Sequence, residues 1–411
     1  MLTTRLTFFQ ALLTKDTRAI YYVLVFSFDF LVGLTATIYS LYLLRNGLDL
    51  FQVNLVNTVF MLGSVIFEIP TGALADYAGR KISVLLSFAC LPIGFGIYYF
   101  SSSIGWFMFA ELWIAFAVAC LSGALDAWVI DQIQHQGYTS KTDLVFSHGG
   151  IASGLALLLG GVIGAQLGNI SLGLPFGFGA IFGLLVLLFT YWGMMETINH
   201  TKRRQFHWLT GVKSIRHAFN PVVIWLLLAT GVANFAFQPL NMYWSPRVME
   251  MTNHQVWLLS YVWIGVSLSL MLGAYLAQRF TKFTMSQHWL FVITTLILAL
   301  PIIIIASTSV VSTLLSGFFI YEIGRGLLTP LHKSFLNKHI PANERATLLS
   351  FDSLISKLCA GAGLILFGYL ARQYSISLTW LLAGLILLFL IPLYYYATKN
   401  SKLTAEYKRE N

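Results

Sequence analysis

Long apolar stretches alternate with short polar connections along almost the whole chain. Each stretch approaches the ~20 apolar residues that a helix needs to cross a bilayer core of ~30 Å. The stretches contain glycine and lack the apolar/polar alternation of membrane β-barrel strands, so helices are expected. We predict twelve membrane-spanning helices, numbered in chain order, near residues 19–44, 52–70, 82–101, 104–128, 145–168, 173–196, 220–246, 255–277, 286–306, 309–332, 346–371 and 376–397.

The composition agrees with a multi-spanning membrane protein. Hydrophobic residues make up 57% of the 411 residues and charged residues only 10%, with a mean hydropathy of +0.74. Soluble domains carry about 25% charged residues, so a soluble fold could not bury this much apolar surface. Cys90, Cys120 and Cys359 lie in separate apolar runs without His or Cys at ligand spacing. We therefore expect no disulfide, no metal site and no cofactor.

The positions of the basic residues predict the orientation. The formal net charge is +9. With the N-terminus in the cytoplasm, 20 of the 25 Lys and Arg fall on the cytoplasmic side and only Arg45, Arg247 and Arg372 outside. The positive-inside rule thus explains the excess charge without nucleic-acid binding, and it predicts that both termini are cytoplasmic. The N-terminal segment lacks a small-residue cleavage site, so no cleaved signal peptide is expected.

The most specific motif is the charged segment 68–81, which reads EIPTGALADYAGRK. We predict a tight turn at the cytoplasmic face, in which Gly72 and Gly79 adopt backbone angles that a side chain resists, and Asp76 caps a helix or pairs with Arg80. The alternative is an ordinary charged loop of an unrelated membrane protein. The spacing of these four residues and Lys81 closely resembles the signature loop between helices 2 and 3 of the major facilitator superfamily of secondary transporters.

That resemblance implies an all-α membrane protein with twelve transmembrane helices in two parallel six-helix pseudo-repeats, and a substrate site midway through the bilayer between them. The halves match weakly at an offset of 203 residues, where Gly123 corresponds to Gly326 and Ser147 to Ser350. We assign the domains accordingly. They are an N-terminal bundle at 1–196, a basic cytoplasmic linker at 197–219, and a C-terminal bundle with a cytoplasmic tail at 220–411. The linker is expected to lie solvated at the anionic inner surface, with a regulatory site as the alternative.

Two carboxyl groups lie inside predicted spans of the first half. An ionisable side chain at mid-bilayer costs at least ~2.5–3.5 kcal/mol on insertion scales. Asp29 lies near the middle of span 1 and Glu111 in the outer part of span 4. Desolvation favours the neutral form of a carboxyl, so each can carry a proton and release it when water enters. We predict Asp29 as the first proton-coupling candidate and Glu111 as the second, with carboxyls held by hydrogen bonds to a neighbouring helix as the alternative.

Spans 10 and 11 carry four further charges. Glu322 and Arg325 are three residues apart on one helix face and can pair directly. Asp352 and Lys357 are five apart and share no face, so Lys357 is expected to pair with an acid on another helix. The resemblance implies that spans 1, 4, 7 and 10 line the central cavity. These four residues are therefore either cavity residues or a structural lock between spans 10 and 11.

Span 7 contains polar side chains at helical spacing. Asn234, Gln238 and Asn241 fall on one face, followed by Trp244. Amides and aromatic rings can bind an apolar or weakly polar substrate, or they can hold neighbouring helices together. Both interpretations remain open.

We also predict a cytoplasmic gate, a charge network that breaks when the transporter opens inward. Asp126 and Asp131 lie near the cytoplasmic end of span 4, where the alternative is a solvated helix end. The predicted gate residues are Gly72, Asp76, Gly79, Arg80, Lys81, Asp126, Asp131 and Arg345.

Span 5 contains Gly160, Gly164 and Gly168 at four-residue steps, which predicts close helix contact. The stripe resembles the fifth-helix motif of the drug/proton antiporter branch, although Ala165 replaces its proline and Asn169 its final glycine. Ala119 likewise replaces the arginine of the fourth-helix motif. The segments EIPTG and SGALDAW resemble a prokaryotic subgroup that includes multidrug and macrolide-type exporters.

The resemblance implies proton-coupled efflux of a small, lipophilic molecule by alternating access, in the cell membrane. The expected partners are the substrate, protons and membrane lipids, and a monomer is expected. An importer of a sugar, peptide or other metabolite is the alternative on the same fold. A membrane receptor or intramembrane enzyme is the alternative from another class. The sequence shows no nucleophile/base pair and no phosphate-binding loop, so an enzyme is not expected.

Overall fold

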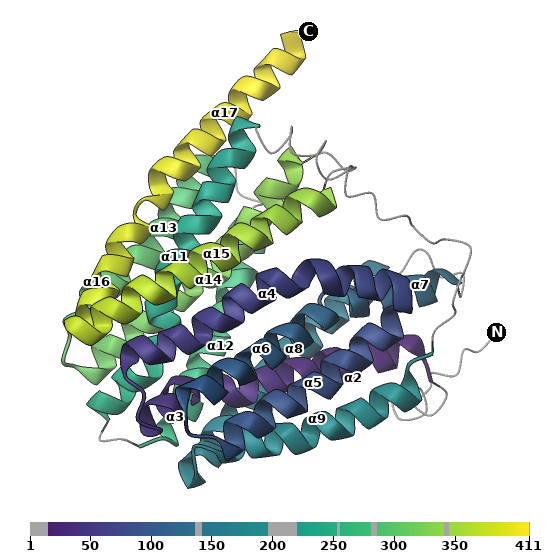
Figure 1. Ribbon diagram of the computed structural model, residues 1–411. Helices are drawn as coiled ribbons and strands as arrows, with labels where there is room; N and C mark the ends of the chain where they lie inside the picture. Colours follow the sequence, from purple (N-terminus) through teal and green to yellow (C-terminus); the bar gives the residue numbers. More distant parts are fainter. Residues whose placement is uncertain are drawn as a thin grey trace, which may run out of the picture. The chain divides into compact units, whose positions relative to one another are not determined.

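Figure 1 shows the computed structural model, which describes residues 15–135, 142–195, 220–252, 255–280, 286–340 and 345–410. Helices make up the regular structure of these ranges, and no strand occurs within them. The predicted linker at 197–219 lies outside the described residues. The all-α architecture expected from the apolar pattern is confirmed.

The first six predicted spans correspond to eight helices. Span 1 consists of α2 and α3, and span 4 of α6 and α7. Gly123 separates the latter two with a φ of +73°, which favours glycine. The helices are α2 (Thr17–Ala36), α3 (Tyr39–Arg45), α4 (Leu50–Ala78), α5 (Arg80–Phe100), α6 (Ile104–Leu121), α7 (Ala124–His135), α8 (Thr142–Ile170) and α9 (Leu174–Gly193).

The last six predicted spans correspond to seven helices, because α16 and α17 together form span 12. Pro239 and Pro246 lie inside α11. The helices are α11 (Pro221–Met251), α12 (Leu258–Phe280), α13 (Gln287–Ile305), α14 (Val311–His339), α15 (Arg345–Gln373), α16 (Ile376–Leu387) and α17 (Leu390–Glu410).

Eleven stretches of the described chain are long and apolar enough to cross a membrane. They coincide with eleven of the twelve predicted spans. The remaining helix, α14, has 29 residues and is long enough to span, but it is not among the eleven. Its charged residues, Glu322, Arg325, Lys333 and Lys338, lower its hydropathy.

Asp16 is the N-cap residue of α2, just before the first span. Its carboxylate accepts hydrogen bonds from the backbone N–H groups of Arg18 (2.9 Å) and Ala19 (3.4 Å) at the start of α2. The Arg18 guanidinium also pairs with it at 2.9 Å. Partial burial acts to raise the pKa of Asp16, but the hydrogen bonds and the positive charge of Arg18 outweigh it and hold that pKa below the usual value.

The chain divides into two compact units. The described residues of one unit fall within 1–46, 62–206 and 256–263, and those of the other within 47–61, 207–255 and 264–411. The start of α4 therefore packs with the second unit, where Asn54 Nδ2 donates to Tyr243 Oη at 2.5 Å. The start of α12 packs with the first, where Gln166 Nε2 donates to Ser260 Oγ at 3.0 Å. The predicted domain boundaries at 196 and 220 remain a prediction.

In the first unit, the glycine stripe of α8 lies directly against α2. A Cβ atom at Gly160 would collide with the Phe30 carbonyl oxygen, and one at Gly164 with the Leu34 carbonyl oxygen. At Gly168 the nearest atom would be Cγ2 of Ile38, at 2.9 Å. The predicted close contact along this stripe is confirmed, because the missing side chains of these glycines let the two helices approach closely.

The second unit repeats this packing. A Cβ at Gly363 of α15 would lie 2.5 Å from the carbonyl oxygen of Phe235 in α11. Gly363 follows Gly160 by 203 residues, the same offset that relates Gly123 to Gly326. Corresponding helices therefore meet through a glycine and a phenylalanine carbonyl in both units, which supports the predicted internal repeat.

The predicted turn at 68–81 is shorter than expected. Helix α4 continues to Ala78 and α5 begins at Arg80, so Gly79 alone connects them. The prediction that Gly72 adopts a turn conformation is wrong, because Gly72 lies within α4. The prediction is correct for Gly79, whose φ is +106° and ψ +154°. Asp76 pairs with Arg80 at 2.6 Å, as expected.

We expect Gly79→Ala to destabilise the protein. Backbone angles in this region are adopted essentially only by glycine, and a side chain there costs about 1–3 kcal/mol. The matched control is Gly72→Ala, at a helical position where a Cβ meets nothing within 4 Å. Thermal melting of the purified full chain should show a lower transition for Gly79→Ala and an unchanged or slightly higher one for Gly72→Ala. Equal transitions in both variants would contradict the strained connection.

Candidate functional site

Glu111 occupies a buried polar cluster in the first unit. It lies on α6 and is 4% exposed. Its Oε1 accepts hydrogen bonds from the Tyr39 hydroxyl at 2.8 Å and the Tyr98 hydroxyl at 2.5 Å. The Tyr42 hydroxyl donates to the Tyr98 backbone carbonyl. The structure thus brings a predicted proton site together with three tyrosines that the sequence analysis did not single out.

No Lys or Arg among the described residues forms an ion pair with Glu111. A buried carboxylate without a cation loses the solvation that stabilises its charge. Two phenol donors compensate in part, since hydrogen bonds to a charged acceptor are stronger than neutral ones. Gain of a proton removes the buried charge, so the site is chemically suited to proton exchange.

Asp29 lies on α2 in the same unit but in a different environment. It is partly buried, and its carboxylate has a hydrogen bond with the Ser153 side chain of α8. The alternative of a carboxyl held by a neighbouring helix therefore describes Asp29 and Glu111 alike. Glu111 is the more enclosed of the two.

Glu322 and Arg325 pair directly on α14, as their spacing predicts. Arg325 Nη1 donates to Glu322 Oε1 at 3.0 Å and to Asn241 Oδ1 of α11 at 3.1 Å. The Glu322 side chain is 2% exposed and that of Arg325 28%. The guanidinium also lies 5.5 Å from the ring centroid of Phe237 and 5.9 Å from that of Tyr321. Glu322 is therefore buried, whereas Arg325 remains partly accessible.

The side-chain amides of Asn234 and Gln238 donate hydrogen bonds to backbone carbonyls of their own helix, α11. Asn234 Nδ2 donates to the Thr230 carbonyl and Gln238 Nε2 to the Asn234 carbonyl, both at 2.9 Å. Trp244 is buried and stacks on Phe318 with centroids 6.2 Å apart. Asn241 is the predicted amide that reaches a charged side chain.

Asp352 and Lys357 are both partly buried on α15. Asp352 Oδ1 accepts a hydrogen bond from Thr230 Oγ1 of α11 at 2.6 Å and lies 3.9 Å from His332 Nε2 of α14. Sequence reasoning missed His332. A signal existed, because His332 follows Arg325 by seven residues, two helical turns, and so shares its face of the helix.

Most of the predicted gate residues lie near helix ends, whereas Gly72 lies within α4. Besides the pair of Asp76 and Arg80, Asp126 accepts a hydrogen bond from the Tyr21 hydroxyl at 2.9 Å. Asp131 at the end of α7 and Arg345 at the start of α15 are exposed. Lys81 Nζ donates to the carbonyls of Tyr191 (3.0 Å) and Met194 (2.6 Å), and so binds the C-terminal end of α9. The gate itself remains a prediction.

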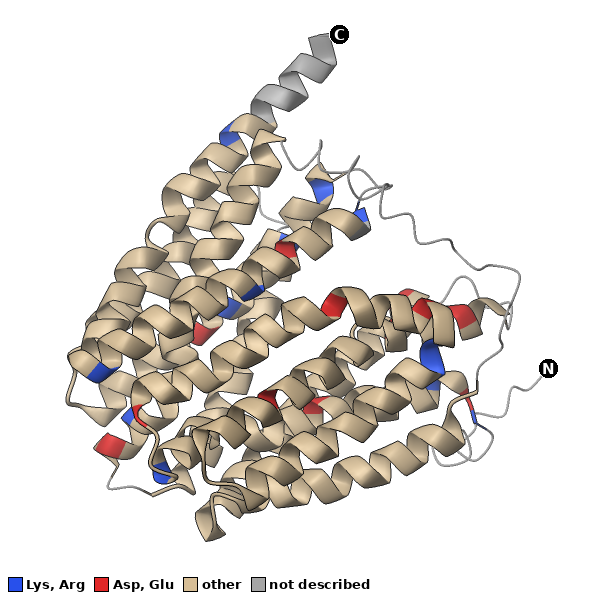
Figure 2. Cartoon of the chain, in the orientation of Figure 1, with Lys and Arg blue, Asp and Glu red and all other residues tan. Residues whose placement is uncertain are grey.

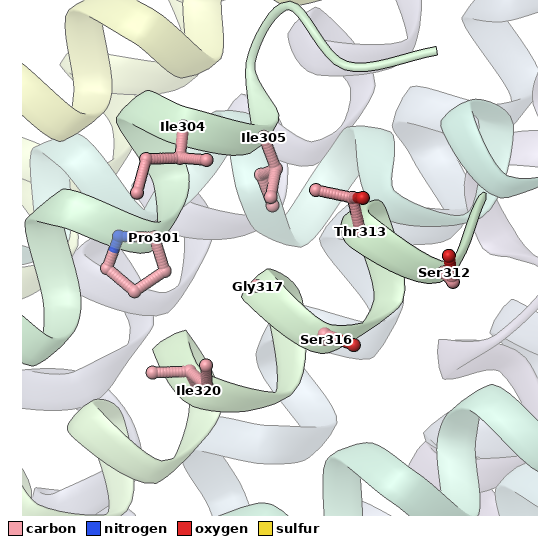
Figure 3. Close-up of a pocket in the computed structure, with 8 residues that line it drawn as sticks. All are labelled: Pro301, Ile304, Ile305, Ser312, Thr313, Ser316, Gly317 and Ile320. Atoms are coloured by element: carbon pink, nitrogen blue, oxygen red, sulfur yellow. The ribbon is translucent and has the colours of Figure 1, made fainter. Parts of the chain in front are cut away.

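Figure 2 shows that charged residues are sparse along the described helices, and that a few acidic and basic positions nevertheless lie inside the bundles. A separate groove lies between α13 and α14. Figure 3 shows its eight lining residues, which include none of the predicted site residues. Its lining is aliphatic with a few hydroxyl groups, at Ser312, Thr313 and Ser316.

Comparisons with known proteins agree on the superfamily. The sequence profile of the Major Facilitator Superfamily matches residues 21–285 and 252–411. The chain is 22% identical over 400 residues to the MFS-type transporter YxaM of Bacillus subtilis strain 168, covering 91% of this chain and 95% of that protein.

Solved structures share the fold. The nucleoside transporter NupG superposes with a TM-score of 0.79 at 14% identity, over 92% of this chain and 99% of that one. A bacterial homologue of the human lysosomal transporter Spinster gives 0.74 at 14% identity, over 94% and 98%. The POT family transporter PepTSo gives 0.71 at 12% identity, over 94% and 98%. From its helices and from the match along nearly its whole length, this chain is a multi-pass membrane transporter that belongs to the major facilitator superfamily.

Proposed function

We propose that this transporter is a proton-coupled exporter of small, largely apolar compounds. Transport would proceed by alternating access, with protons bound at Glu111 or Asp29 exchanged against substrate. The proposal follows the resemblance of the sequence to multidrug and macrolide-type exporters. We further propose that it acts as a monomer in the cell membrane, with both termini in the cytoplasm, as the distribution of Lys and Arg indicates.

The observation that carries the proton-coupling proposal is the Glu111 cluster. A carboxyl that is 4% exposed has two phenol donors and no basic partner in the described part of the chain. Such a group is neutral when protonated, and when it is ionised its buried charge costs free energy. Its proton affinity therefore depends on whether water reaches it, which is the property that coupling to alternating access requires.

The aromatic ring of Phe237 beside Arg325 supports an apolar substrate. Phe237 is only partly buried, and an aromatic face binds apolar surface without requiring a defined hydrogen-bond pattern. We propose Arg325, Asn241 and their neighbours on α11 as the substrate-contacting residues of the second unit. We propose the cytoplasmic gate with the residues named from the sequence.

A second candidate function, import of a polar metabolite, is favoured by one observation. Nη1 of Arg325 donates to Glu322 and Asn241, and 28% of the Arg325 side chain is exposed. A guanidinium held in this way can offer its remaining N–H donors to a carboxylate or other acceptor on a substrate.

Accumulation of lipophilic dyes and antibiotics in cells that express the protein, with and without a protonophore, distinguishes the two functions. The exporter proposal predicts lower accumulation of at least one compound than in cells with an empty vector, and loss of that difference with the protonophore. Unchanged dye accumulation, together with protonophore-sensitive uptake of a labelled metabolite, would overturn it in favour of import.

A further inference from the structure

A second cluster of titratable groups lies in the second unit, where four helices meet. Thr230 of α11, His332 of α14, Asp352 of α15 and Tyr394 of α17 form a continuous chain of contacts. Thr230 Oγ1 lies 2.6 Å from Asp352 Oδ1 and 3.1 Å from His332 Nε2. His332 Nδ1 lies 2.9 Å from the Tyr394 hydroxyl. His332 is 8% exposed and Tyr394 1%.

The geometry fixes the direction of these hydrogen bonds when Asp352 is ionised. Thr230 has one hydroxyl proton, which it donates to the carboxylate, so Thr230 Oγ1 must accept from His332 Nε2–H. Neutral His332 then has an unprotonated Nδ1, which accepts from the Tyr394 hydroxyl. The chain of donors therefore runs from Tyr394 through His332 and Thr230 to Asp352.

Adding one proton to Asp352 reverses every bond in this chain and breaks none. The carboxylic acid then donates to Thr230 Oγ1, and the Thr230 hydroxyl donates to His332 Nε2. His332 becomes the other neutral tautomer, and its Nδ1–H donates to the Tyr394 oxygen. The Tyr394 hydroxyl hydrogen rotates away from His332 and then has no partner among the four residues. A buried polar network is costly when a member loses its partner, but the three contacts that join these four residues are kept in both states.

We propose that Thr230, His332, Asp352 and Tyr394 form a proton-binding site in the second unit, with Asp352 as the group that takes up the proton. The proton comes from water. The O–H bond of Asp352 forms, and the imidazole proton of His332 moves from Nε2 to Nδ1, so the cluster holds one proton more in total. The site is separate from Glu111 and Asp29, which belong to the first unit. It does not depend on the direction of transport or on the substrate.

Few other charged groups lie near the cluster. Lys333 follows His332 on α14 and is exposed, and Lys357 lies on α15 five residues after Asp352. Helix α13 contributes an apolar face, since Phe291 stacks on Tyr394 with centroids 4.0 Å apart. His288 of α13 lies against Tyr395 instead, at 5.2 Å.

Infrared difference spectroscopy of the purified full chain tests the site without a substrate. Lowering the pH should produce a carboxylic-acid C=O band that Asp352→Asn lacks. Thr230→Val removes the hydroxyl that links Asp352 to His332, so the midpoint of this band should differ from that of the wild type by about one pH unit. Thr329→Val is the matched control, because Thr329 is an exposed threonine whose hydroxyl donates to Arg325 O of its own helix.

The inference is overturned if the wild-type and Asp352→Asn spectra are the same at every pH, or if Thr230→Val and Thr329→Val have equal midpoints. This outcome is distinct from failure of the proposed function. A band that depends on Asp352 in a protein whose transport ignores the proton gradient would retain the site and reject proton coupling. Gradient-driven transport in a protein without this band would retain proton coupling and reject the site.

Discussion

Replacing Glu111 with glutamine should strongly reduce protonophore-sensitive export while leaving the protein folded. Glutamine keeps a carbonyl oxygen that can accept the hydroxyls of Tyr39 and Tyr98, so the cluster retains acceptor geometry. It cannot bind or release a proton, so substrate movement loses its link to the gradient. Coupling between two ligands typically changes affinity by about 5–150-fold, and we expect a loss of gradient-driven export in that range.

Two variants separate this effect from general damage. Glu250→Gln removes a carboxylate at the exposed end of α11, where it pairs with Arg247 at 3.0 Å, and should leave export unchanged. Tyr98→Phe keeps the carboxyl but removes one donor, and should give an intermediate loss. Export by Glu111→Gln with undiminished sensitivity to the protonophore would exclude Glu111 as the coupling group and leave Asp29 as the first-unit candidate.

The second large effect concerns stability. The double variant Gly160→Ala with Gly164→Ala should lower the free energy of unfolding strongly, because each new methyl group collides with a backbone carbonyl of α2, at Phe30 and Leu34. Backbone atoms cannot move aside as a flexible side chain can. Overpacking typically costs about 1–3 kcal/mol per site, or roughly 2–6 kcal/mol for both if the sites add.

The matched control lies on the same helix. Gly150 and Gly154 of α8 have nothing within 4 Å of a built Cβ. Their double replacement by alanine should therefore raise stability by up to about 1 kcal/mol per site, from helix propensity alone. Thermal melting of both purified variants measures the difference. Similar transitions would show that the two helices can separate slightly at no cost, and the close contact would have no energetic role.

The span pattern could be predicted from the sequence because it depends on hydropathy, which each residue contributes independently of its neighbours in space. The helix breaks were harder. Nothing in the apolar pattern shows that α4 continues through Gly72 to Ala78, since glycine is tolerated in a helix as well as in a turn. Gly79 was identifiable because Arg80 and Lys81 follow it directly, at the start of the next apolar run.

The side-chain clusters could be predicted only within one helix. The pair of Glu322 and Arg325 follows from a spacing of three residues. The contact of Glu111 with Tyr39, by contrast, joins residues 72 positions apart, and its geometry depends on how α3 and α6 pack. Tyrosines in an apolar run give no sign of which hydroxyl meets a carboxylate. The same limit explains why His332 was missed, since its partners come from three other helices.

Substrate-induced proton movement in proteoliposomes tests the central claim of proton-coupled transport most directly. The purified chain is reconstituted with a pH-sensitive dye inside the vesicles, and compounds that the cellular assay identifies as transported are added without an imposed gradient. The account predicts a change of internal pH with the wild type and none with Glu111→Gln. Movement of the compound across the membrane with no accompanying change of pH in the wild type would contradict it.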